Sequence, residues 1–85
     1  MTAAARRQAR ARALAQSTLT LFARGQVGRR LEHHVTTGPA DVWQTEAGHH
    51  CRCYGIQGPP QASRTAAIVA WARLTLDQTD ERTAA

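Results

Sequence analysis

Apolar residues recur at helical spacing through the first part of the chain. Residues 3–24 contain no glycine and no proline, and most of them favour helices. On a helical wheel one broad arc collects small and apolar side chains, and a basic margin runs beside it. Gly25 follows as a typical stop signal, so the pattern predicts an amphipathic helix over residues 3–24. The arc consists of Ala4, Ala11, Leu14, Ala15, Thr18, Leu21 and Phe22.

The middle of the chain alternates with a period of two. Residues 31–37, 41–45 and 49–54 form short runs rich in β-branched and aromatic side chains, and turn residues separate them. We expect three antiparallel strands, with a three-residue loop at 46–48 and Gly48 in its left-handed position. A two-residue loop is the alternative, and it would shift the last strand and place both cysteines with the charged residues. The three-residue loop places on one face Leu31, His33, Val35, Trp43, Thr45, His49, Cys51 and Cys53.

A second helix is expected over residues 61–77, because Pro59 and Pro60 suit a helix entrance. Between residues 65 and 76 the only charge is Arg73, so this helix is apolar on nearly all sides. Such a helix is buried on two sides. One side covers the sheet, and the other meets the first helix or a second chain.

These elements predict an α+β fold of the order αβββα. Two helices are expected to pack on one face of a three-stranded antiparallel sheet. The length predicts a single small domain over residues 1–85, with a frayed tail at residues 79–85.

Charge is distributed unevenly along the chain. Residues 1–30 carry seven arginines and no acid, whereas residues 31–85 carry four arginines and six acids, so the net charges are +7 and −2. Lysine is absent, and the arginine guanidinium favours planar, bidentate recognition of phosphate. The pattern predicts a non-enzymatic nucleic-acid-binding protein that contacts mainly backbone phosphates of DNA or RNA. A solvated helix flank is the alternative. The expected contacts are Arg6, Arg10, Arg24, Arg29 and Arg30, with Arg52 and Arg64 as lesser candidates.

A protein–protein interaction module is the rival hypothesis. A small inhibitor or regulator, of phage or mobile-element origin, would dock through the apolar C-terminal helix at Trp71, Leu74 and Ala67. A homodimer would bury the same helix face, and an acidic protein partner would suit the arginines. Tyr54 beside Arg52 is the expected exposed stacking surface.

Histidines and cysteines gather in the middle of the chain. In the expected register His33, His49, Cys51 and Cys53 share one face, and zinc prefers these ligand types, so a zinc site is one interpretation. The other is a pair of buried cysteines in the core, which the Cys-x-Cys spacing favours. A cysteine nucleophile with a histidine base would need a third orienting group, so we expect no enzyme activity and no cofactor.

Cysteine use and hydropathy bear on the compartment. The two cysteines form no disulfide framework, so a reducing, cytoplasmic location is expected. No apolar run reaches the roughly 18–20 residues that a bilayer requires, so we expect no membrane association. The arginine-rich N-terminus also has the composition of a mitochondrial presequence, which stays as the alternative.

The expected order helix–strand–strand–strand–helix, the length and the Gly38-Pro39 turn resemble the double-stranded-RNA-binding domain over residues 5–76. Asp41 stands where that family's Gly-Pro loop carries a histidine, and Arg64 stands in place of its lysine cluster. The resemblance implies that the first helix, the Gly-Pro loop and the start of the last helix would span grooves of duplex RNA.

Overall fold

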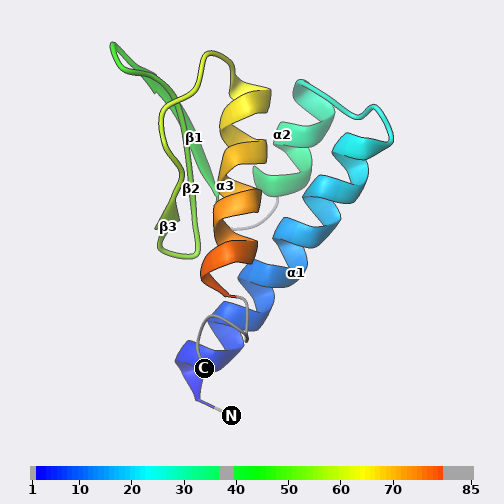
Figure 1. Ribbon diagram of the computed structural model, residues 1–85, viewed down its shortest axis with the longest axis vertical. Coiled ribbons are helices and arrows are strands. Elements are labelled where there is room, and N and C mark those ends of the chain that lie inside the picture. The colour runs from blue at the N-terminus through cyan, green and yellow to red at the C-terminus, as the bar shows by residue number, and fades with distance from the viewer. Residues whose placement is uncertain (1, 37–39, 80–85) are drawn as a thin grey trace.

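The computed structural model describes residues 2–36 and 40–79, and its α+β class confirms the expectation (Figure 1). A three-stranded antiparallel sheet, in the order β1-β2-β3, has its helices on one face. None of the helices in this part of the chain has the length and apolar composition needed to cross a membrane. The elements are α1 (Ala3–Ala23), α2 (Arg29–Thr36), β1 (Asp41–Thr45), β2 (Gly48–Cys53), β3 (Ile56–Gln57) and α3 (Arg64–Gln78).

Helix α1 begins and ends as its sequence predicts. The Thr2 hydroxyl caps the first turn by accepting a hydrogen bond from the Ala5 N–H at 3.0 Å. At the other end Gly25 has a φ of +88°, and the N–H of Gln26 donates to the Leu21 carbonyl. This left-handed glycine satisfies carbonyls of the last turn and ends the helix.

The expected first strand, residues 31–37, is wrong, because Arg29–Thr36 forms helix α2. Leu31 and Val35 are both fully buried, and a spacing of four residues places them on one helical face. The same pair also fits a period of two, with His33 between them, but His33 is exposed in the helix. The spacing of Leu31 and Val35 thus fits both a strand and a helix, and in the structure it is the helix that buries them. The Gly38-Pro39 turn lies outside the described residues, between α2 and β1 rather than between two strands.

The sheet consists of β1, β2 and the two-residue β3. The expected strands at residues 41–45 and 49–54 are present as β1 and β2, but their register differs by one position. Thr45 pairs with Gly48, so the loop has two residues and not three. Trp43 therefore lies opposite His50 on the outer face, where the two rings stack with centroids 5.1 Å apart.

Only a glycine fits at position 48, because the segment after β3 passes close to its backbone. Its φ is +129°, and a Cβ at this position would lie 2.6 Å from the Gln61 carbonyl oxygen. The Gln61 N–H and carbonyl both bond to His49, so this segment continues alongside β2. One extra residue separates this bridge from the β2–β3 pairing, so Pro59 and Pro60 fall in a bulge that needs no N–H from them.

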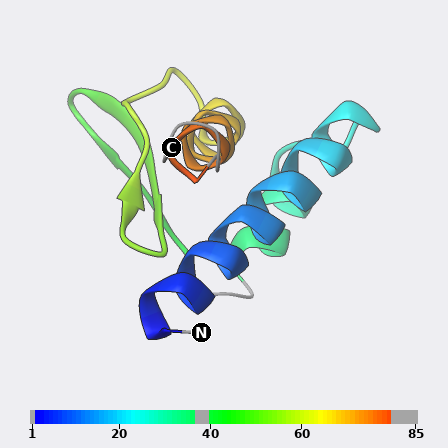
Figure 2. The same cartoon turned by 60° about the horizontal axis from the view of Figure 1, so that its bottom comes forward.

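Helix α3 lies between the sheet and the α1–α2 pair (Figures 1 and 2). Trp71 is fully buried, and its indole N–H donates to the Cys53 carbonyl at 3.2 Å. Ala67 is also fully buried, and Leu74 is half-buried. Both apolar sides of α3 are therefore covered within one chain. The expected docking surface at Trp71, Leu74 and Ala67 is wrong, because Trp71 and Ala67 belong to the buried core and only Leu74 stays partly exposed.

Among the described N-terminal arginines, Arg12 forms side-chain hydrogen bonds within the fold. Its guanidinium donates to the Leu76 carbonyl at 3.1 Å and to the Thr79 hydroxyl at 3.3 Å, at the end of α3. It thereby satisfies a carbonyl of the last turn and places a positive charge at the negative end of the helix dipole.

We predict that Arg12→Ala lowers the free energy of unfolding by about 1–3 kcal/mol, because a half-buried, charged donor to the end of α3 is lost. Arg10→Ala is the matched control on the same helix, and we expect a change within about 0.5 kcal/mol for this exposed residue. Urea unfolding followed by circular dichroism measures both. Equal losses for the two variants would contradict a capping role for Arg12.

Candidate anion-binding cleft

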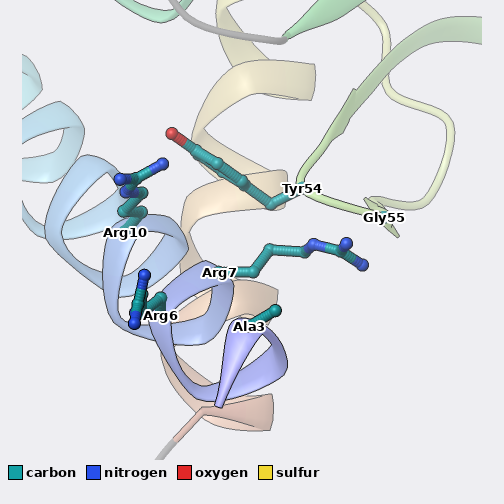
Figure 3. A pocket seen from close by; sticks show the side chains of 6 residues that line it. All are labelled: Ala3, Arg6, Arg7, Arg10, Tyr54 and Gly55. Carbon is teal, nitrogen blue, oxygen red and sulfur yellow. The ribbon is translucent and has the colours of Figure 1, made fainter. Parts of the chain in front are cut away.

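A cleft of about 560 Å³ opens between the first turns of α1 and the turn that joins β2 to β3 (Figure 3). The two sides are far apart in sequence and meet because α1 and the sheet both pack against α3. We name this feature the arginine–tyrosine cleft. It is lined by Ala3, Arg6, Arg7, Arg10, Tyr54 and Gly55.

Helical spacing gathers the three arginines of the cleft. Arg6 and Arg10 are four residues apart on one face of α1, and Arg7 extends from the neighbouring face toward Gly55, so all three line the cleft (Figure 3). All three are exposed, and none forms an ion pair or hydrogen bond with another described residue. No acid lies in the first turn of α1, where the helix dipole is positive. The cleft is thus a concentration of positive charge that no acid among the described residues neutralises.

A tight turn supplies the aromatic wall. Tyr54 and Gly55 are the two loop residues between the paired Cys53 and Ile56, with φ values of 53° and 77°. Two positive φ values mark a type I′ turn, which favours asparagine and glycine. Tyrosine in the left-handed region costs roughly 1–2 kcal/mol. In return the turn directs the Tyr54 ring toward α1, with its hydroxyl end on the side of Arg10, while Arg7 extends toward Gly55 (Figure 3).

Of the arginines predicted to bind phosphate, the cleft collects Arg6 and Arg10 only. Arg7 was not among the predicted contacts, but it lines the cleft as well. The signal available was the adjacency of Arg6 and Arg7 in an acid-free segment. Arg24 lies at the opposite end of α1, about 27 Å away along the axis at 1.5 Å per residue. The predicted basic surface is therefore divided between the two ends of the helix.

A second basic region surrounds the start of α2. Arg29 and Arg64 border a hollow of about 430 Å³ that also contains Glu32. The Glu32 carboxylate pairs with Arg64 at 3.3 Å, so part of the positive charge is neutralised there. Arg30 is exposed beside this region. The described lining of the arginine–tyrosine cleft, by contrast, contains no acid.

Arg52 and Tyr54 do not form one surface, which corrects the expected pairing. Arg52 lies on the outer face of the hairpin, 3.4 Å from the Asp41 carboxylate and with its guanidinium carbon 5.6 Å from the centre of the Trp43 ring. Tyr54 instead faces α1. A salt bridge and a cation–π contact thus occupy Arg52 within the chain.

The expected zinc site required a strand at residues 31–37, but Arg29–Thr36 is helical. His33 lies on α2, and Cys51 and Cys53 point into the core on the other side of the hairpin from Trp43. Within residues 2–36 and 40–79 no group of three or more His, Cys, Asp or Glu side chains is placed to hold a metal ion. Burial raises the pKa of Cys51 to about 12, and the neighbouring Cys53 and Asp41 add to the rise. Burial likewise raises the pKa of Cys53 to about 11.

No family model, curated protein or solved structure matches the chain. No family membership follows, and the chemistry of the cleft rests on its own side chains.

We predict that both thiols of the folded protein react slowly with Ellman's reagent at neutral pH. The thiolate is the reactive form, and a raised pKa with a buried side chain removes both the charge and the access. The same raised pKa values stabilise the fold below about pH 9, the ordinary thiol value, and this contribution is lost as the pH rises toward 12. The control is the protein in guanidinium chloride, where both thiols should react rapidly. Fast labelling of the native protein would contradict this placement.

Proposed function

We propose that this protein binds nucleic acid through the sugar–phosphate backbone, with Arg6, Arg7 and Arg10 as the principal contacts. One observation carries the proposal. Three exposed guanidiniums line a single cleft at the positive end of α1, and no acid of the described chain neutralises them.

The chemistry of the cleft suits phosphodiesters. Guanidinium keeps its charge at all working pH values and offers a planar fork of donors to phosphate oxygens. Arg6, Arg7 and Arg10 present three such groups within about 6 Å of axial rise, so they can contact neighbouring phosphates of one strand. The lining residues offer no nucleophile with an adjacent base, so the proposed role is binding without chemical conversion.

The far end of α1 supplies a secondary contact for a longer strand. Arg24, Arg29 and Arg30 are exposed and lie close together in sequence around the α1–α2 turn. About 27 Å of helix separates Arg24 from Arg6. A nucleic acid that reached both ends would have to follow the length of α1, so the cleft alone is the minimal site.

Two other partners compete with this proposal. An acidic protein segment would offer carboxylates to the same arginines. Duplex RNA follows from the likeness to the double-stranded-RNA-binding domain, although α2 occupies the position of that layout's first strand. Polyglutamate and duplex RNA are therefore arms of the test. The apolar docking face of α3 is dropped, since the chain's own core covers it.

We predict that Arg6→Gln, Arg7→Gln and Arg10→Gln together reduce affinity for nucleic acid by at least about tenfold at low salt, because three phosphate contacts are lost. For the unaltered protein, log K should fall against log[salt] with a slope of roughly −2 to −3, as expected for three contacts. Fluorescence anisotropy with labelled DNA and RNA, single-stranded and duplex, measures both quantities.

The matched control removes the same charge at the other end of α1. Arg24→Gln, Arg29→Gln and Arg30→Gln together should weaken binding much less than the cleft triple. Equal losses for both triples would show that net charge, and not the cleft, attracts the ligand. Tighter binding of polyglutamate than of any nucleic acid would overturn the proposal in favour of a protein partner.

A further inference from the structure

Tyr54 occupies a turn position that its side chain does not favour. A type I′ turn is easily made by Asn-Gly, and the Gly55 that follows already meets half of this requirement. No hydrogen bond of the Tyr54 side chain offsets the backbone strain at a φ of 53°, because no described residue bonds to it. Strained backbone of this kind points to a role for the side chain that the turn presents.

The Tyr54 ring separates two hollows. It lines the arginine–tyrosine cleft on one side and a neighbouring hollow of about 310 Å³ on the other. Arg7 lines both hollows as well, beside the ring. The ring is half-buried, and within the described chain no other aromatic ring or guanidinium stacks on it. The ring packs in part against the core, and the part of it that lines the cleft lies next to three cationic groups.

Trp43 provides the contrast within the same molecule. Its ring is stacked on His50 at 5.1 Å between centroids, and Arg52 lies over it at 5.6 Å. Asp41 neutralises that arginine. On the outer face of the hairpin Trp43 and Arg52 thus already have partners within the chain, whereas the arginines of the cleft have no ion pair, hydrogen bond or ring contact among the described residues.

An aromatic face beside unpaired guanidiniums is the arrangement that binds single strands. Bases stack on aromatic side chains while cationic groups follow the backbone, and every base offers a π-face for this. In a duplex the base faces are stacked on their neighbours, so Tyr54 can contribute only when a base is unstacked. The cleft volume of about 560 Å³ lies within the usual range of roughly 300–1,000 Å³ for sites that enclose a small organic group.

We infer that the arginine–tyrosine cleft binds an unpaired nucleotide, with its base stacked on Tyr54 and its flanking phosphates on Arg6, Arg7 and Arg10. The inference rests on the proposed function and narrows it, since the ligand becomes single-stranded nucleic acid rather than a duplex. Tyr54 is the residue that discriminates between them, and the arginines supply affinity for both.

The test measures binding of Tyr54 variants to oligomers with and without bases. The probes are labelled oligothymidylate, oligouridylate, an abasic phosphodiester of equal length and a hairpin duplex, titrated by fluorescence anisotropy at low salt. Tyr54→Leu keeps an apolar side chain but removes the π-face, and it should weaken binding to the base-bearing single strands by about tenfold. Tyr54→Phe keeps the ring and should stay within about twofold of the unaltered protein. All three proteins should bind the abasic strand equally.

Trp43→Leu is the matched aromatic control and should leave all affinities unchanged. Photo-crosslinking of the unaltered protein to a 5-bromouridine oligomer gives a second measurement that needs no variant to fold, and the crosslink should map to Tyr54. Equal binding of oligothymidylate by Tyr54→Leu and Tyr54→Phe, a crosslink elsewhere, or a preference for the duplex would overturn the inference and leave backbone binding standing. No binding of any nucleic acid at low salt would overturn the proposed function itself.

Discussion

The burial of α3 on both of its sides is the interaction on which the rest of the structure depends. Trp71 and its neighbours fill the space between β2 and α1, and the Trp71 indole hydrogen bond fixes the helix to the Cys53 carbonyl. Loss of a buried tryptophan side chain typically costs about 3–5 kcal/mol, a large part of the stability of a domain of this size. Cys53 is the last residue of β2, so the same contact sets the position of the Tyr54 turn that follows it. The residues of α3 that are buried are Ala67, Ile68, Val69, Trp71, Ala72 and Thr75.

The fold sorts arginines that look alike in sequence. Arg12 turns inward and caps the end of α3, while Arg52 and Arg64 are paired with acids. Arg6, Arg7 and Arg10 stay exposed around one cleft, and the remaining N-terminal arginines gather at the other end of α1. The arginines therefore have different physical roles, and those at the two ends of α1 keep exposed guanidiniums that an external anion can reach.

The two long helices could be predicted from sequence because each extends over many residues, but the expected start of the second at residue 61 is wrong: Gln61 pairs with His49, and α3 begins at Arg64 behind the Ser63 cap. Gly25 marks the end of α1, and the apolar run around Trp71 predicts a helix buried on two sides. Helix α2 could not be predicted in this way. Its eight residues contain only two buried apolar side chains, Leu31 and Val35, whose spacing fits a strand as well as a helix. Tertiary contacts hold this segment in place: the Ser17 hydroxyl oxygen is hydrogen-bonded to His34 Nε2 at 2.8 Å, and the Gly28 N–H donates to the Thr65 hydroxyl.

Only one side of the candidate site could be predicted from sequence. The acid-free arginine segment indicated Arg6 and Arg10, but the partner surface depends on the register of the hairpin and on the turn at Tyr54. Trp43 stacks with His50 only when the loop has two residues, and polarity alone favoured three. The convergence of α1 with residues about 45 positions later in the chain depends on packing against α3, which no local pattern encodes.

The most direct test of the central claim is a map of backbone amide chemical shifts during titration with a single-stranded oligonucleotide. The arginine–tyrosine cleft predicts that the largest changes fall at residues 3–10 and 53–56, with small changes around Arg24, Arg29 and Arg30. Changes centred on α2, or spread evenly over every exposed arginine, would contradict a localised site. The signals of Gly48 and Trp43 at the far end and outer face of the hairpin provide the internal reference.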